Sequence, residues 1–168
     1  TIADYSNDGT TGDPMCVRYT EMDDDADIVT VMGCVNDRYG SLGTMADRTN
    51  QTLYGACHTL FAGLIDKYPN AKIGIILTPQ YGKGIPAYVE TQGGDPEQNY
   101  LRAKVNAVRE VAEYYSLPVC DLFNHGGIPG MLPNTIGRLL QNDYLHITTE
   151  GYKVLARQLL PFMRNLIG

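Results

Sequence analysis

Apolar runs alternate along this chain with segments of helical periodicity, and this alternation limits the folds that the chain can adopt. Asp27–Gly33 (DIVTVMG) and Lys72–Thr78 (KIGIILT) are near-continuous apolar runs rich in β-branched residues, and Leu117–Leu122 (LPVCDL) is a shorter one. Runs that are apolar on both faces are typical of parallel strands covered by helices on each side. Between them, residues 50–68 and 98–115 carry apolar side chains at helical spacing. The chain therefore has the order βαβαβ.

This order predicts an α/β fold, a three-layer αβα sandwich around a parallel, flavodoxin-like sheet with right-handed crossovers. A last helix is expected over residues 149–167, with Thr148 as its N-cap. No repeat or linker divides the chain, so residues 1–168 are expected to form a single domain. Two long loops, Tyr81–Glu97 and His125–Asn134, leave the carboxyl ends of strands, where open α/β sheets bind ligands.

Charge and hydropathy exclude several classes of function. The chain has 13 Lys and Arg against 19 Asp and Glu, a formal net charge of -6, and thus no basic surface for nucleic acid or anionic membranes. No apolar stretch approaches the ~20 residues of a membrane-spanning helix, so we expect a soluble domain, cytoplasmic or secreted. No GxGxxG or GxxxxGK[ST] motif supports a nucleotide-binding alternative.

The four cysteines lie far apart, without a CxxC pair or a Cys/His cluster at metal-ligand spacing. Three of them stand inside apolar runs. The pattern favours buried free thiols over a disulfide framework and gives no support for zinc. The residues are Cys16, Cys34, Cys57 and Cys120.

The first candidate site is Cys34-Val35-Asn36-Asp37, directly after the Asp27–Gly33 strand. An Asn at the carboxyl end of a parallel strand can aim its amide into the crevice, where an oxyanion needs a fixed donor. Taken alone, the segment is more typical of an ordinary strand-to-helix turn, because Gly, Asn and Asp are turn formers.

The second candidate site is Asp143-Tyr144-Leu145-His146, just ahead of the last predicted helix. An Asp and a His three residues apart in a loop can fold back on one another, so that the carboxylate fixes the tautomer of the imidazole. The imidazole then acts as a general base toward a hydroxyl. The alternative is a capping Asp143 and a surface His146.

Together the two segments resemble the SGNH hydrolase family, also called GDSL-like lipases and acylhydrolases. The third block of that family reads G-x-N-D and its fifth D-x-x-H, ahead of a C-terminal helix that often begins G-Y. The segments around Asn36 and His146 occur here in that order, on the strand and loop types that the family uses, and Gly151-Tyr152 follows. The resemblance covers essentially the whole chain.

The resemblance implies a role for each matching residue. Asn36 would be the oxyanion donor, His146 the general base and Asp143 its orienting partner, whereas Asp37 would fix the turn. It implies an acyl-enzyme mechanism without metal or cofactor, on a small ester or an acylated carbohydrate. Cys34 stands where the motif has its first glycine, so its Cβ would crowd the turn if φ is positive.

The sequence lacks the first block of the family, G-D-S, whose serine is the nucleophile. No serine stands in a G-D-S context, and Ser6 lies too close to Asn36 in sequence to be the nucleophile. We therefore expect the first strand of the sheet to be missing from this chain and a companion N-terminal segment upstream of Thr1 to supply the serine. That segment is expected to stay bound, because a sheet without a central strand would expose an unpaired edge. A thiolate nucleophile at Cys34 is the weaker alternative.

Several other residues are of types that functional sites use. His58 and His125 are expected to be structural and solvated, respectively. The run Asp23-Asp24-Asp25 is expected to be a solvated cap rather than a calcium site. The alternative to an esterase is a non-catalytic module on the same scaffold that binds a glycan or another ligand by stacking on tyrosines. Those tyrosines are Tyr81, Tyr88, Tyr100 and Tyr144.

Overall fold

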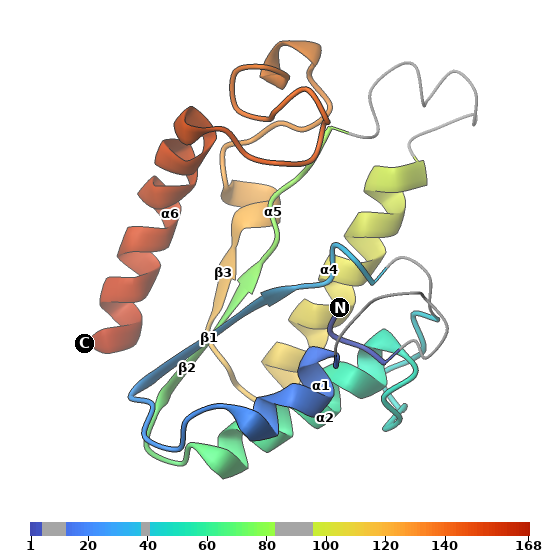
Figure 1. The fold of residues 1–168 in the computed structure, drawn as a ribbon, viewed down its shortest axis with the longest axis vertical. Helices are drawn as coiled ribbons and strands as arrows, with labels where there is room; N and C mark the ends of the chain where they lie inside the picture. Colours follow the sequence, from blue (N-terminus) through green and yellow to red (C-terminus); the bar gives the residue numbers. More distant parts are fainter. Residues whose placement is uncertain (5–12, 38–40, 83–95) are drawn as a thin grey trace.

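The computed structural model describes residues 1–4, 13–37, 41–82 and 96–168. Its centre is a parallel sheet of three strands in the order β1-β2-β3 (Figure 1). In register, β1 pairs with β2 from Ile28↔Lys72 to Gly33↔Leu77, and β2 pairs with β3 from Ile75↔Val119. The strands are β1 (Ile28–Gly33), β2 (Lys72–Leu77) and β3 (Val119–Asp121).

Two helices connect the strands, and a third follows them. They are α2 (Leu53–Lys67), α4 (Pro96–Tyr114) and α6 (Thr149–Ile167). The predicted βαβαβ order and the parallel αβα architecture are thus confirmed. The third strand is shorter than expected, because Asp121 accepts a hydrogen bond from the backbone N–H of Asn124 and thereby caps a short helix, α5 (Leu122–His125).

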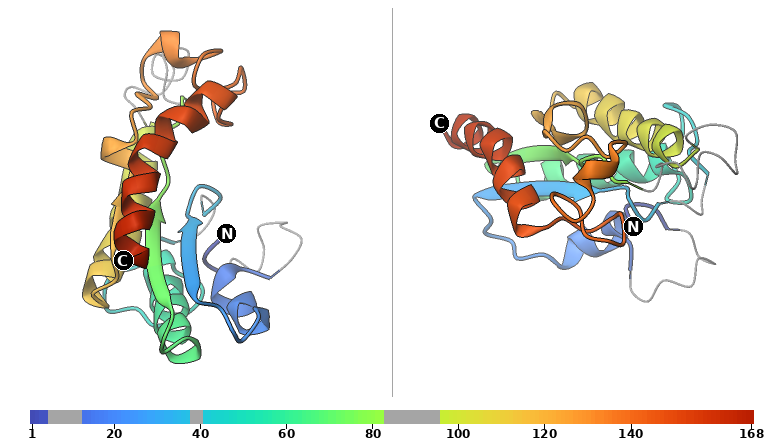
Figure 2. Two further views of the ribbon diagram at one scale, coloured as in Figure 1. Left: turned by 90° about the vertical axis from the view of Figure 1, so that its left-hand side faces the viewer. Right: turned by 90° about the horizontal axis from the view of Figure 1, so that it is seen from above.

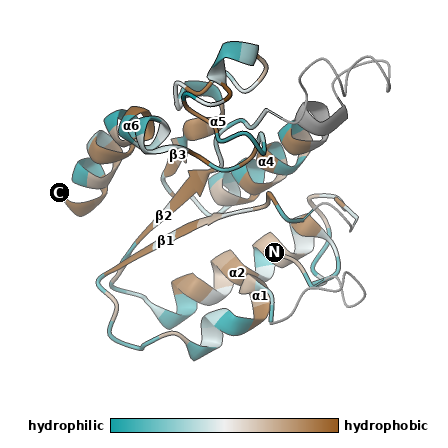
Figure 3. Cartoon of the chain, turned by 45° about the horizontal axis from the view of Figure 1, so that its top comes forward, coloured by the Kyte–Doolittle hydropathy of each residue, from teal (hydrophilic) through white to brown (hydrophobic). Residues whose placement is uncertain are grey.

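Alternate side chains of β2 enter two hydrophobic clusters. Ile73, Ile75 and Leu77 join the larger cluster with buried residues of α2 and α4. Ile76 joins the smaller cluster with Leu155 of α6, and Figure 2 shows α6 apart from α2 and α4. Figure 3 shows apolar residues along β1 and β2 and mixed polarity along α6. The sheet therefore lies between α2 and α4 on one face and α6 on the other.

The outer edge of β1 pairs with no strand in the described part of the chain. Its residues alternate between buried and exposed, and Ile28 and Met32 are 39% and 44% exposed. A largely apolar groove of about 350 Å³ follows this edge, walled by α1 (Met15–Arg18) and η1 (Tyr19–Glu21) and floored by Leu60 and Leu64 of α2. The groove therefore borders the edge of the sheet that is unpaired among the described residues.

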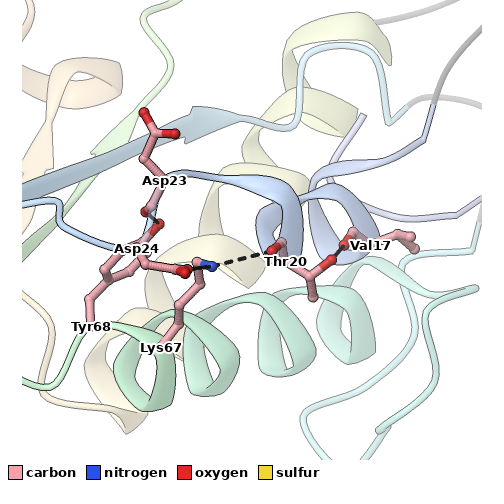
Figure 4. Close-up of polar contacts among 6 residues, drawn as sticks. All are labelled: Val17, Thr20, Asp23, Asp24, Lys67 and Tyr68. Carbon is pink, nitrogen blue, oxygen red and sulfur yellow. Dashed lines mark hydrogen bonds and ion pairs between the residues drawn. The ribbon is translucent and has the colours of Figure 1, made fainter.

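The acidic run before β1 serves to fasten the end of α2 (Figure 4). Lys67 pairs with Asp24 at 2.5 Å and also donates to the carbonyl of Thr20, while the Tyr68 hydroxyl donates to the carbonyl of Asp23. The pair with Lys67 lowers the pKa of Asp24. No group of three His, Cys, Asp or Glu side chains within the described ranges is arranged to hold a metal ion. The run is solvent-exposed, as the sequence predicted, and the Asp24 side chain is 92% exposed although it pairs with Lys67.

The four cysteines are free and buried, as predicted. Across the described ranges no helix has both the length and the apolar content needed to cross a membrane.

The last of the short helices is η2 (Pro133–Thr135). It lies in the loop region between α5 and α6, which extends beyond β2 and β3 in Figure 1.

Candidate active site

Asn36 lies in the turn that follows β1, at the carboxyl end of the strand. Its side chain is exposed and borders a pocket of about 200 Å³, which Thr1 and Thr78 also line. Thr78 is the first residue after β2. The pocket thus lies beyond the carboxyl ends of two neighbouring strands, the edge where open α/β sheets bind ligands.

Asp37 is turned inward, away from any substrate. It is 1% exposed, and its carboxylate accepts hydrogen bonds from the backbone N–H groups of Ile2 and Ala3 at 2.9 to 3.0 Å. The backbone N–H of Asp37 donates to the carbonyl of Cys34. Asp37 therefore fixes the turn, as the resemblance implied, and it also fastens the start of the chain to that turn, which the sequence did not predict.

Cys34 adopts a left-handed backbone conformation, with φ of 77°. The predicted conflict between its Cβ and the turn is thus present, since an L-residue pays roughly 1 to 2 kcal/mol in this region. The thiol is 2% exposed, and burial raises its pKa to about 12. A buried, protonated thiol is a poor nucleophile, which argues against the alternative of Cys34 catalysis.

The strain at Cys34 predicts an inverted order of stability between two variants. We expect Cys34→Gly to be more stable than Cys34→Ala by about 1 kcal/mol, because both lose the thiol and only glycine is free of the left-handed penalty. Urea unfolding followed by circular dichroism measures the difference. Cys57, buried in α2, is the matched control, where Ala should exceed Gly by about 1 kcal/mol. An Ala variant at Cys34 as stable as the Gly variant would contradict the strain.

Asp143 and His146 form the predicted pair. The imidazole Nδ1 of His146 is hydrogen-bonded to Oδ2 of Asp143, whose Oδ1 accepts from the backbone N–H groups of Leu145 and His146 at 3.0 Å each. The hydrogen bond from His146, followed by the two backbone bonds, holds the pKa of Asp143 well below its usual range. Tyr144 makes this tight turn possible with φ of 65°. The imidazole remains 68% exposed.

The start of α6 holds the back of this loop. The backbone N–H of Thr148 donates to the carbonyl of Leu139, and the Thr148 side chain accepts from the N–H of Gly151, which confirms the predicted N-cap. A Cβ on Gly151 would lie 2.2 Å from the Leu139 oxygen. Only glycine fits here, which gives a physical reason for the glycine that follows the D-x-x-H motif.

Two contacts place the Asp143–His146 loop relative to the sheet. The backbone N–H of Gly82, beyond β2, donates to the carbonyl of Tyr144 at 2.7 Å. Leu145 packs against the larger hydrophobic cluster, which includes Cys34. The loop and Asn36 thus both lie past the carboxyl ends of β1 and β2. No hydrogen bond joins Asn36 to His146 or Asp143 in the described part of the chain, and the catalytic roles of the three residues stay predictions.

The other two histidines occupy the places that the sequence predicted. His58 is 1% exposed, and its ring nitrogens contact the Tyr115 hydroxyl and the Met45 carbonyl. Desolvation, followed by the charge of Arg48, lowers the pKa of His58. His125 is exposed at the end of α5. Neither belongs to the Asp143–His146 loop.

The tyrosines considered for glycan stacking do not form a common surface among the described side chains. Tyr81 is 5% exposed and belongs to the hydrophobic core, so its ring is buried and does not offer the stacking surface that the glycan-binding alternative requires. Tyr81 follows β2 in a segment without helical or strand periodicity, so the sequence pattern did not predict its burial. Tyr144 is 44% exposed. Tyr88, the side chain of Tyr100 and most of the expected loop 81–97 lie outside the described residues.

One buried residue near the site was missed by the sequence reasoning. Lys104 of α4 is 1% exposed, and its ammonium group donates to the carbonyl of Val35, next to Asn36. The signal was present, because residue 104 falls on the apolar stripe of its helix, three residues after Leu101 and four before Val108. A lysine on such a stripe indicates a buried cation with a partner.

Comparison with known proteins agrees with this geometry. A family model of the GDSL-like lipase/acylhydrolase family matches residues 3–154. Proteins with curated annotation gave no match. A solved structure of a protein from Lactobacillus plantarum is similar, with 27% identity and a TM-score of 0.78 over 94% of this chain and 76% of that one.

Two further structures carry descriptions of activity. Axe2, an acetylxylan esterase from Geobacillus stearothermophilus, is 25% identical with a TM-score of 0.54, over 82% of this chain and 59% of its own. A lipase/acylhydrolase from Enterococcus faecalis shares the fold at 23% identity and a TM-score of 0.55, over 83% of this chain and 62% of its own. The match to the family model and the similarity to Axe2 support hydrolase activity in general, whereas the Enterococcus faecalis structure supports the fold. On the match of the family model to most of its length, the chain belongs to the GDSL-like lipase/acylhydrolase family.

Proposed function

We propose that this chain is the larger part of a serine ester hydrolase in which Asn36, Asp143 and His146 act on a small ester. The observation that carries the proposal is the pair in the loop before α6. Asp143 holds Nδ1 of His146, and the imidazole is 68% exposed. No described residue is hydrogen-bonded to Nε2, which is therefore available to a hydroxyl nucleophile.

In the proposed reaction, Nε2 of His146 takes the proton of a serine hydroxyl as its oxygen attacks the ester carbonyl. The amide of Asn36 donates to the negative oxygen of the tetrahedral intermediate, where the charge develops. His146 then gives the proton to the departing alcohol, leaving an acyl-serine. Water repeats the sequence, its proton passing to His146 and then back to the serine as the acid leaves.

The described serines do not meet His146. Ser116 lies just before β3, at the amino-terminal edge of the sheet, whereas His146 lies beyond the carboxyl-terminal edge. Ser41 pairs with the backbone of Thr52 at the start of α2, and Ser6 lies outside the described residues. We propose that the serine comes from a companion segment upstream of Thr1 that pairs with the free edge of β1. The apolar groove along that edge supports this placement.

A covalent label tests the source of the serine. The full-length polypeptide, with any sequence that precedes Thr1, is incubated with a fluorophosphonate and digested, and the modified serine is located by mass spectrometry. We expect a single labelled serine upstream of Thr1, together with turnover of p-nitrophenyl acetate. Label on a serine within residues 1–168, or no label on an active protein, would refute this part of the proposal.

The proposed substrates are small acyl esters, including acetylated carbohydrate. The similarity to an acetylxylan esterase supports acetylated carbohydrate as a substrate. The exposed ring of Tyr144, two residues before His146, is a surface on which a sugar ring can stack. Comparing kcat/KM for acetylated xylan and p-nitrophenyl acetate measures the preference.

A further inference from the structure

Lys104 is a buried cation on the inner face of α4. It is 1% exposed and among the largest fully buried side chains of the chain. Transfer of an ammonium group into a protein interior is costly unless hydrogen bonds compensate it. A buried lysine therefore marks a place where its charge or its hydrogen bonds serve a purpose.

The hydrogen bond of Lys104 reaches the turn after β1. Its Nζ donates to the carbonyl oxygen of Val35 at 3.2 Å, across 69 residues of sequence. Its positive charge also acts on the neighbouring thiol of Cys34, where it opposes the effect of burial on the pKa of that thiol. Lys104 thus lies directly behind the residues that lead into Asn36.

The backbone on both sides of Asn36 is restrained. Before it, the Val35 carbonyl accepts from Lys104 and the Cys34 carbonyl accepts from the N–H of Asp37. After it, the Asp37 carboxylate is held by the backbone of residues 2 and 3. The Asn36 side chain itself is exposed and borders the pocket. The peptide carrying Asn36 is therefore fixed while its amide is left available.

We propose that Lys104 is a positioning residue for the oxyanion donor: its hydrogen bond to the Val35 carbonyl holds the turn and so aims the Asn36 amide. The inference rests on the proposed esterase function. A donor that is held in place before the reaction pays no reorganisation cost as the oxyanion forms. Loss of Lys104 should therefore slow the chemical step more than it weakens substrate binding.

The test compares Lys104→Met with Lys153→Met in the full-length protein. Lys153 is an exposed lysine of α6 that pairs only with Glu150 among the described residues, so it matches the change in charge. With p-nitrophenyl acetate, we expect Lys104→Met to lower kcat about tenfold with KM within about twofold, a fraction of the loss expected for a missing oxyanion donor. Lys153→Met should leave both constants unchanged.

The double variant separates positioning from general loosening of the fold. If Lys104 acts through Asn36, Lys104→Met should cost about tenfold in the wild-type background and almost nothing in an Asn36→Ala background. Equal losses in the two backgrounds would overturn the inference. If Lys104→Met does not fold, as judged by circular dichroism, Lys104→Gln replaces it in both backgrounds under the same criterion.

A readout independent of activity separates this inference from the proposed function. The NMR order parameter of the Asn36 side-chain amide should fall in Lys104→Met and stay unchanged in Lys153→Met. An unchanged order parameter would overturn the positioning role, even in an active enzyme. Absence of turnover in the wild-type protein would instead refute the esterase function, and the order parameter would still decide whether Lys104 holds Asn36.

Discussion

Replacing His146 by alanine should lower the kcat of the full-length protein for p-nitrophenyl acetate by roughly ten-thousand-fold, with KM little changed. Without the imidazole, no described group that Asp143 orients can take the proton of the attacking hydroxyl, and only oxyanion stabilisation and binding remain. Stability should change by less than about 0.5 kcal/mol, because the side chain is 68% exposed. Initial rates and a thermal melt measure the two quantities.

His125→Ala is the matched control for this variant. It removes another exposed histidine, at the end of α5 and outside the Asp143–His146 loop, and should leave the rate unchanged. Retention of activity in His146→Ala would refute the proposed mechanism. An equal loss in both variants would point to general damage.

Replacing Asp143 by asparagine should lower kcat by roughly a thousand- to ten-thousand-fold at neutral pH. The asparagine has nearly the same shape but can favour the wrong tautomer of His146 and cannot stabilise its charged form. Asp25→Asn removes one negative charge from an exposed residue of the acidic run and should leave the rate unchanged. A loss below tenfold in Asp143→Asn would show that the carboxylate does not orient the base.

The lowered pKa of Asp143 sets the direction of the pH dependence. Because the folded state lowers this pKa, the stabilisation of the loop by the carboxylate is complete above the unfolded value of about 3.9 and is lost only as pH falls toward the folded value. Asp143 therefore stays ionised at neutral and mildly acidic pH. A pH–rate profile from pH 5 to 9 measures how kcat/KM of the wild-type protein depends on pH. Any fall of kcat/KM on the acidic side of this range should not come from protonation of Asp143, whose pKa lies below the range.

Sequence reasoning succeeded for the elements that bury a continuous surface. The run Lys72–Thr78 became β2, which is buried on both faces, and Asp27–Gly33 became β1, of which one face is buried. The periodic segments became α2, α4 and α6. The Asp143–His146 pair was predictable because its hydrogen bonds are local in sequence. Short segments such as η1 and α5 escaped, since one turn of helix shows no periodicity.

The remainder of the site depends on contacts between distant residues. Nothing local to Lys104 names Val35 as its partner, and nothing local to Asp37 names Ile2. Tyr81 was misjudged for the same reason, because its burial depends on the elements that pack around it. Cys34 was an intermediate case: the motif indicated where a Cβ would conflict, and the fold supplied the positive φ.

The hydrogen bonds from residues 2 and 3 to the Asp37 carboxylate fix where a preceding polypeptide meets the candidate site. Thr1 borders the same pocket as Asn36, so any polypeptide joined to it leaves from the rim of the candidate site. A tag inserted directly before Thr1 would separate it from the companion segment proposed above and would crowd the entrance. Gly168 caps α6 at the left of Figure 1, away from the N label, and a tag joined after it would leave that entrance clear.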